Sequence, residues 1–155
     1  MSLALVTSTA PSTPAALPPL VDAPEFDAEL ARFLDSLDVA QLYAVETMCM
    51  QRQVAKYEAQ LLTALRRRAR EVVAEGETAS RWPVVTLTFG TGAYDNGVFW
   101  DEYSVEARHL DGSLSTVDLD FEDVCGVLAD LSSALRPDGT DSIVVQLRTG
   151  EFEYQ

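Results

Sequence analysis

The chain has 155 residues, 47% of them hydrophobic, which suits one folded domain with at most a short appendage. Its formal net charge is −14 at pH 7, and this excess of carboxylates argues against binding to nucleic acids or anionic membranes, because both attract positive protein surface. No apolar run is long enough to span a bilayer, and the two cysteines, Cys49 and Cys125, lie far apart, so we expect free thiols in a cytoplasmic protein.

The first 24 residues are rich in alanine, serine and threonine and contain prolines at positions 11, 14, 18, 19 and 24. Proline blocks a continuous helix, and the apolar residues of this stretch follow no burial pattern. No basic residue precedes the short apolar start, so a secretory signal is not expected. We predict that residues 1–24 form a disordered tail.

Residues 25–76 repeat apolar side chains every three or four positions, which predicts helices. Pro24 and Glu25 open a first helix, and Ser36 or Asp38 caps a second one that ends near Gly76. At 1.5 Å per residue, the second helix would be about 50 Å long, which is more than the small sheet that follows can cover.

The apolar stripe of this long helix therefore needs a partner, and a second copy of the same helix is the simplest one. A break into two helices that pack on each other is the alternative. The residues that we predict to form the dimer contact are Met50, Val54, Tyr57, Leu61 and Leu65.

Residues 82–155 change to β-branched and alternating patterns, with hairpin signals at Asn96-Gly97 and Asp111-Gly112. Strands near residues 83–90, 98–109 and 113–119 are predicted to form an antiparallel meander. The chain is thus predicted to be α+β, with N-terminal helices, one of them long and amphipathic, followed by a small antiparallel sheet of order β-β-β-α-β.

The second half of this acidic α+β domain begins with a helix that Asp120 is expected to cap and Pro137 to stop. After the helix, Ile143, Val145 and Leu147 alternate on one face of a strand. The alternation changes phase at Thr149-Gly150, which predicts a β-bulge or a tight turn there.

The acidic side chains concentrate in the second half of the chain. Residues 1–81 hold 8 basic and 11 acidic side chains, a net of −3, whereas residues 82–155 hold 3 and 14, a net of −11. The run Arg66, Arg67, Arg68 and Arg70 invites a nucleic-acid interpretation. We favour charges near a helix C-terminus that pair with the acidic sheet.

The strand predicted over 98–109 carries the candidate partner-binding surface. If it is continuous, odd positions face the core and Trp100 lies among carboxylates on the water-facing side, as an aromatic anchor with a charged rim. Alternatively, the helices cover that face and Trp100 belongs to the core. The candidate partner-binding residues are Trp100, Glu102, Glu106 and Asp118.

The usual catalytic and metal motifs are absent from the sequence. The single histidine, His109, is expected to be exposed beside a turn, and it excludes a zinc site that needs two histidines. The acidic stretch DLDFED, residues 118–123, does not have EF-hand spacing, and we interpret it as charge at a helix N-terminus. We therefore predict no enzyme, no metal and no cofactor.

In general character, though in no motif, the chain resembles small inhibitory proteins such as bacterial immunity proteins and phage-encoded inhibitors. That resemblance implies a non-enzymatic cytoplasmic binding protein whose acidic sheet face docks on a basic protein. The alternative is a structural or assembly protein that works through its long helix as a homo-oligomer. In both cases we expect a homodimer, without nucleic acid or membrane partners.

Overall fold

The computed structural model describes residues 24–78 and 80–155, so the predicted tail lies almost entirely outside the described residues. The chain divides into two compact units, Met1–Tyr43 and Ala44–Gln155. The order of elements is helices followed by a small antiparallel sheet with one further helix, and the predicted α+β class is confirmed.

The first unit contains helix α1 (Pro24–Asp35) and the first turn of helix α2 (Val39–Glu75). Asp38 caps α2: its Oδ1 accepts a hydrogen bond from the Gln41 amide, while Gln41 Oε1 accepts one from the Asp38 amide. This reciprocal pair is a capping box. The hydroxyl of Ser36, the other predicted cap, donates to the Phe33 carbonyl instead.

Helix α2 is continuous over 37 residues, which corresponds to about 55 Å. The alternative of two helices packed on each other is therefore wrong.

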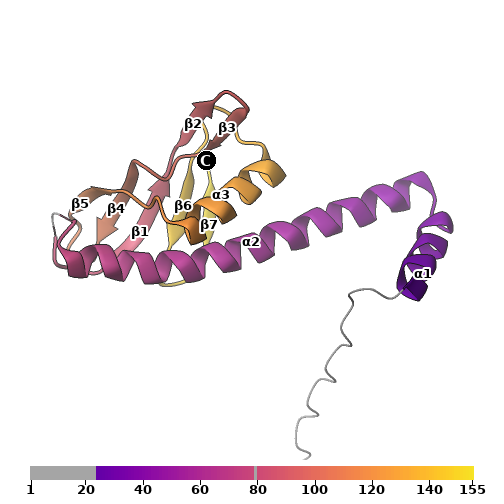
Figure 1. Ribbon diagram of the computed structural model, residues 1–155, viewed down its shortest axis with the longest axis horizontal. Coiled ribbons are helices and arrows are strands. Elements are labelled where there is room, and N and C mark those ends of the chain that lie inside the picture. Colours follow the sequence, from indigo (N-terminus) through magenta and orange to yellow (C-terminus); the bar gives the residue numbers. More distant parts are fainter. Residues whose placement is uncertain (1–23, 79) are drawn as a thin grey trace, which may run out of the picture. The chain divides into compact units, whose positions relative to one another are not determined.

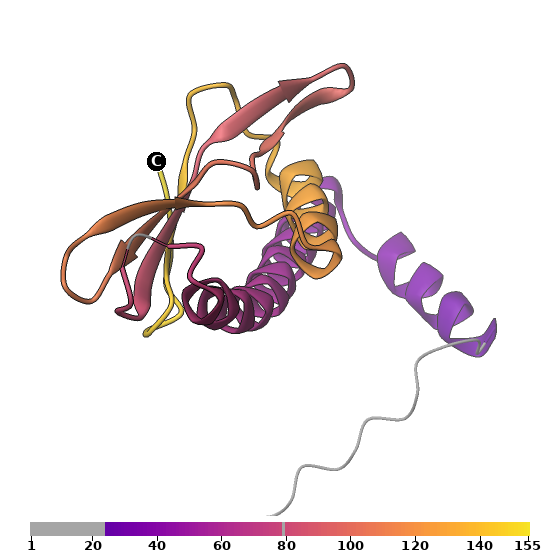
Figure 2. The ribbon, with the colours of Figure 1, turned by 60° about the vertical axis from the view of Figure 1, so that its left-hand side comes forward.

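The second unit is built on a five-stranded antiparallel sheet of order β5-β4-β1-β6-β7, and a separate two-stranded hairpin, β2-β3, follows β1. The C-terminal half of α2 and helix α3 lie on one side of the sheet and enclose the core (Figures 1 and 2). The elements are β1 (Val84–Phe89), β2 (Thr91–Tyr94), β3 (Gly97–Trp100), β4 (Val105–His109), β5 (Leu114–Val117), α3 (Glu122–Leu135), β6 (Ile143–Gln146) and β7 (Phe152–Tyr154).

The predicted continuous strand over 98–109 is wrong. It is two strands, β3 and β4, that belong to different sheets and are joined by residues 101–104. The joining segment changes the phase of the alternation, so Trp100 of β3 is buried, with 2% of its surface exposed, and so are Val105 and Ala107 of β4. Of the two positions considered for Trp100, the exposed one is wrong and the core position is confirmed.

His109 is also buried, contrary to the expectation of an exposed side chain. Its Nδ1 lies 2.7 Å from the Trp82 carbonyl oxygen and its Nε2 lies 2.9 Å from Ser115 Oγ. Because a carbonyl can only accept, Nδ1 carries a proton and donates to it, and Nε2 shares a hydrogen bond with the serine hydroxyl. Both ring nitrogens are satisfied, which makes His109 a structural residue between β4 and β5.

Three turns were predicted from local signals. The β2-β3 turn is confirmed but falls at residues 95–96, one position earlier than predicted, and it is not of type I′ because neither residue has a positive φ. The β4-β5 turn contains Asp111-Gly112 within a three-residue loop, closed by a hydrogen bond from the His109 amide to the Ser113 carbonyl. The tight turn at Thr149-Gly150 is confirmed, since the Gly150 amide donates to the Gln146 carbonyl.

Asp120 does not cap α3, contrary to prediction. The N-cap residue is Phe121, which offers no side-chain acceptor, and Asp120 binds Cys125 instead. Pro137 follows the end of the helix as expected, because α3 stops at Leu135.

The residues of the predicted dimer contact differ in burial along the length of α2. Leu61 and Leu65 are fully buried in the core of their own chain, so their assignment to a dimer contact is wrong. Val54 and Tyr57 are partly buried against the same core, and Met50 is 47% exposed. Only the N-terminal end of the stripe is free for another molecule.

The arginine run tethers α2 to the rest of the unit, but its ion pairs to other elements are with α3 and not with the sheet. Arg68 also pairs with Glu71 within α2. Arg67 and Arg68 both pair with Asp123 in the first turn of α3, and the Arg68 guanidinium lies 4.0 Å from the centre of the Phe121 ring. Arg66 Nε donates to the Leu147 carbonyl, 2.7 Å away, at the end of β6.

We expect the Asp123→Asn variant to unfold with a free energy about 1–2 kcal/mol lower at pH 7, because hydrogen bonds between charged groups are lost at a partly exposed site. Burial raises the pKa of Asp123, but the hydrogen bonds from Arg68 and Arg67 outweigh it and hold that pKa below its ordinary value of 3.8. The ionised carboxylate therefore stabilises the fold above that pH, and the stabilisation is lost as the pH falls below it. The free energies of unfolding of the wild type and the variant should therefore converge as the pH falls. Urea unfolding between pH 7 and pH 2.5 measures both, and a difference that stays constant would contradict the prediction.

A second prediction concerns Gly150, whose φ is +83° and whose added Cβ would lie 2.8 Å from Leu62 Cδ2. Gly112 has a similar φ of +84° with open space around it. Alanine at position 112 should cost about 1 kcal/mol for the backbone conformation alone, and alanine at position 150 about 1–3 kcal/mol more, because it also displaces Leu62. Thermal or urea unfolding of both variants tests this, and equal losses would mean that the β6-β7 turn does not press against α2.

Candidate functional site

Four carboxylates gather at one end of the sheet, where β3 leads into β4 and β5 leads into α3. They are Asp101, Glu102, Asp118 and Asp120, and we call them the acidic edge. The Leu119 amide donates to the Glu102 carbonyl, 2.9 Å away, which fastens the two connecting segments to each other. The Asp101 amide donates to the Gly90 carbonyl and so fixes the first segment to the end of β1.

The connecting segments place their acids through local turns. Asp101 Oδ1 accepts from the Tyr103 amide, and Asp118 Oδ1 accepts from the Asp120 amide. Aspartate commonly closes turns in this way two residues ahead of the amide it binds. None of the four acids of the edge forms an ion pair with a residue that the structure describes, so their charges remain available.

Like charge crowds Glu102 in particular. Burial raises its pKa first, and repulsion from Asp101, Asp120 and Asp118 raises it further. A positive group from outside would relieve that repulsion and favour the ionised form.

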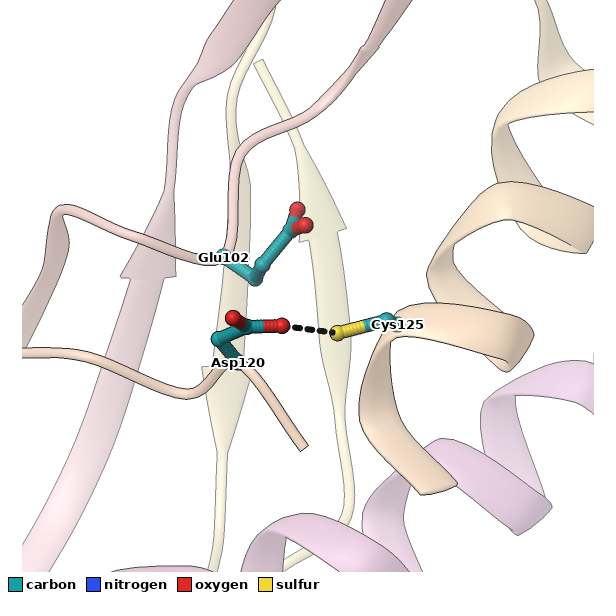
Figure 3. A group of neighbouring side chains, drawn as sticks. All are labelled: Glu102, Asp120 and Cys125. Carbon is teal, nitrogen blue, oxygen red and sulfur yellow. Dashed lines mark hydrogen bonds between the residues drawn. The ribbon is translucent and has the colours of Figure 1, made fainter. Parts of the chain in front are cut away.

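Glu102, Asp120 and Cys125 converge on one point (Figure 3), with one ligand atom from each lying within 4.8 Å of the others. The Cys125 thiol donates to Asp120 Oδ1 over 3.4 Å. Burial, that hydrogen bond and the nearby carboxylates raise the pKa of the thiol from 9.0 to about 11. Two carboxylates and a sulfur are ligands that Zn²⁺ accepts, but the thiol and Asp120 already satisfy each other, and the cluster alone assigns no metal.

A pocket of about 260 Å³ adjoins the acidic edge. Glu102 and Cys125 line it together with apolar and aromatic residues, including Phe99, Trp100 and Leu128. The Trp100 indole Nε1 is buried without a hydrogen-bond partner among the described residues. A donor in this state is unusual in a folded protein, because leaving it unpaired costs about 1–3 kcal/mol.

Two exposed tyrosines flank the acidic edge. Tyr94 lines the pocket and meets Phe99 edge-on, with ring centres 5.9 Å apart. Repulsion from Asp120 and then from Glu102 raises the pKa of Tyr103, which places its phenol beside the same acids. Both tyrosines offer an apolar ring with a polar tip at the surface.

The structure brings together only part of the predicted partner-binding set. Glu102 and Asp118 lie in the acidic edge, and Trp100 lies beneath it as a wall of the pocket. Glu106 is exposed on the face of β4 opposite the core, in alternation with Val105 and Ala107, so it lies apart from the other three.

The predicted partner-binding set did not include Tyr94, Asp101, Tyr103 or Asp120, although Asp120 was predicted as a helix cap. Tyr94 and Tyr103 carry a signal that was available, namely two aromatic residues among acids, but the assumed strand placed Tyr103 in the core.

Comparisons with protein-family models, curated proteins and solved structures gave no match to this chain. None of the helices in residues 24–78 and 80–155 combines the length and apolarity that crossing a membrane requires.

The raised pKa of Cys125 predicts slow thiol chemistry. At pH 8 a pKa of about 11 leaves Cys125 ionised about a hundredfold less than its ordinary value of 9.0 would, and the side chain is also partly buried. Cys125 should therefore react slowly with a disulfide reagent, and far more slowly than the exposed Cys49. In the Cys49→Ser variant only Cys125 remains, so its slow reaction can be measured alone. Asp120→Asn should make that reaction faster, because it removes a negative charge beside the thiol. Equal rates for the two thiols would contradict the arrangement in Figure 3.

Proposed function

We propose that the chain is a non-enzymatic cytoplasmic protein-binding module of the inhibitor or immunity type, which docks its acidic edge on a basic protein partner. The observation that carries this proposal is the gathering of four unpaired carboxylates beside an apolar pocket and two exposed tyrosines. Aromatic side chains supply most of the binding energy in such contacts, and the charges supply specificity and speed of encounter.

The pocket suits one long basic side chain of the partner. A lysine or arginine places its aliphatic stem against apolar walls and its charged head at a polar rim. Here the stem would lie against Phe99 and Leu128, and the head would meet Glu102. Such a contact would lower the pKa of Glu102 toward its ordinary value, since the partner's positive charge offsets the repulsion from the other acids.

A binding experiment with matched charge reversals tests the docking surface. The double variant Glu102→Arg/Asp118→Arg changes two acids of the edge, and Glu106→Arg/Glu153→Arg makes the same change in net charge at two exposed positions on the opposite face of the sheet. Each protein is immobilised and exposed to nuclease-treated host lysate at low and at high salt.

We expect one stoichiometric basic protein to bind the wild type and the Glu106/Glu153 variant and to leave at high salt, because screening weakens exposed charge pairs. The Glu102/Asp118 variant should capture at least tenfold less of this partner. An equal loss of capture in the two variants would show that net charge alone attracts the partner, and equal capture by all three proteins would show that the acidic edge does not bind it. Either result would defeat the proposal.

A second candidate function is self-assembly through α2. The apolar stripe continues past the end of its intrachain cover, so that exposure rises from Leu61, fully buried, to Met50, 47% exposed. Between residues 39 and 60 the helix carries two acidic and two basic side chains, a net charge of zero. A second copy can therefore pair here without the repulsion that the rest of this acidic chain would impose.

Two methionines of similar exposure test this assembly. Met50 lies on the stripe, whereas Met48, 50% exposed, lies about 200° away around the helix. We expect Met50→Glu to convert a dimer into a monomer in sedimentation equilibrium and Met48→Glu to leave the dimer intact. A wild-type chain that is monomeric over the accessible concentrations, or equal effects of the two substitutions, would contradict self-assembly.

A further inference from the structure

A second pocket, unrelated to the acidic edge, has the opposite electrostatic character. It encloses about 400 Å³ between the C-terminal part of α2, the segment before β1 and the end of β6. Four of its lining residues are arginines, out of 11 basic residues in the whole chain, and none of the lining residues is acidic. The arginines are Arg66, Arg70, Arg81 and Arg148.

Three of these arginines have side chains that form no contact with a polar partner among the described residues. Arg66 is committed to the backbone carbonyls of Leu147 and Arg148, and so anchors the turn after β6 to α2. Arg70, Arg81 and Arg148 are exposed, and their guanidinium groups form no hydrogen bond or ion pair with any residue that the structure describes. Among the described basic residues only Arg67 and Arg68 form ion pairs, so the feature that distinguishes these arginines is that they gather around one pocket with no acidic lining residue.

Helical spacing places the arginines of the run on two faces of α2. Arg67 and Arg68 turn toward α3 and pair with Asp123, whereas Arg66 and Arg70, four residues apart, lie on the neighbouring face and line the pocket. Simple pairing with acids therefore accounts for only half of the run.

The floor of the pocket is apolar. Ala69 and Val73 of α2 face Val85 and Leu147 of the sheet across it. Val85 lies at an irregularity of β1, because the pairing with β4 shifts register between Val84 and Thr86. Such β-bulges redirect side chains and are frequent at binding sites.

The pocket is remote from the acidic edge. The edge lies beyond the C-terminal end of β1, through the bond between Asp101 and Gly90, whereas the pocket lies at its N-terminal end, at Pro83 and Val84. Six strand residues separate the two ends by roughly 20 Å. At physiological ionic strength charges are screened over about 8 Å, so the arginines keep a locally positive potential.

We propose that this pocket binds a small organic anion that has an apolar body, such as a carboxylate or phosphate ester on a hydrocarbon chain. The volume falls within the roughly 300–1,000 Å³ typical of small-molecule sites. Guanidinium groups bind carboxylates and phosphates with paired hydrogen bonds, and the apolar floor removes the hydrocarbon from water. A bare inorganic ion would leave that floor unused, and an apolar cation would meet the arginines.

Calorimetric titration of the full chain with three probes tests the inference. Octanoate offers both features of the ligand, acetate offers the charge alone, and octylammonium offers the chain with the opposite charge. We expect octanoate to bind one molecule per chain, acetate to bind at least tenfold more weakly, and octylammonium not to bind at this pocket.

The variants are Arg70→Gln/Arg81→Gln within the pocket and Arg108→Gln/Arg136→Gln as a control of equal charge change outside it. All four side chains are exposed, so the fold should not depend on them, and circular dichroism checks this. Octanoate affinity should fall about tenfold or more in the first variant, because each guanidinium–carboxylate contact contributes roughly a factor of ten, and should stay unchanged in the second.

Three results would overturn the inference. They are an absence of octanoate binding, equal octanoate affinities in the two double variants, and displacement of bound octanoate by octylammonium. A short single-stranded oligonucleotide is titrated in parallel. If it binds through Arg70 and Arg81 while octanoate does not, the arginines form a polyanion surface and the small-anion assignment is wrong.

Discussion

Burial of the C-terminal half of α2 against the inner face of the sheet is the contact on which the second unit depends. Leu61, Leu65 and Val72 are almost completely buried there, together with the inward side chains of β1, β4 and β6. Each such side chain contributes roughly 1.5–3 kcal/mol through its removal from water. The strands, however, are only three to six residues long, whereas the helix has 37 residues. A helix of about 55 Å cannot be covered by strands of at most about 20 Å, so its N-terminal part lacks cover within its own unit.

The same contact determines what the two ends of the sheet can do. With α2 and α3 covering one face, the polar groups that converge at the ends of the sheet come from the connecting segments and from exposed positions of the helices. At one end, the segments around Asp101 and Asp118 hold each other through backbone hydrogen bonds and carry acids. At the other, the end of β6 is held to α2 by Arg66, and the free arginines surround an apolar floor. Opposite charges are thereby separated along the strands, and Arg67 and Arg68 neutralise Asp123 between them.

Periodicity and turn residues in the sequence were sufficient for the class of fold, because both report on local geometry. The capping box at Asp38, the continuous helix to Glu75 and the turn at Thr149-Gly150 follow from residues within a few positions of each feature. Trp100 was placed ambiguously for a different reason. The chain leaves one sheet and joins another between residues 101 and 104, and the hydrogen bonds that fix this transition reach Gly90 and Leu119, which no local pattern reveals.

The candidate sites, like the position of Trp100, depend on contacts between residues far apart in the sequence, which local patterns do not reveal. The excess acid of residues 82–155 was visible as a sum, but its grouping into an edge depends on the pairing of β4 with β5, which brings residue 102 close to residue 118. The arginine run was visible as a motif, yet a helix presents neighbouring residues to different surroundings. Arg68 meets a carboxylate and Arg70 meets none, although both belong to one turn. A charge run on a helix is therefore best interpreted residue by residue, according to what each side chain contacts, and the members that line one pocket together indicate where a ligand of opposite charge would fit.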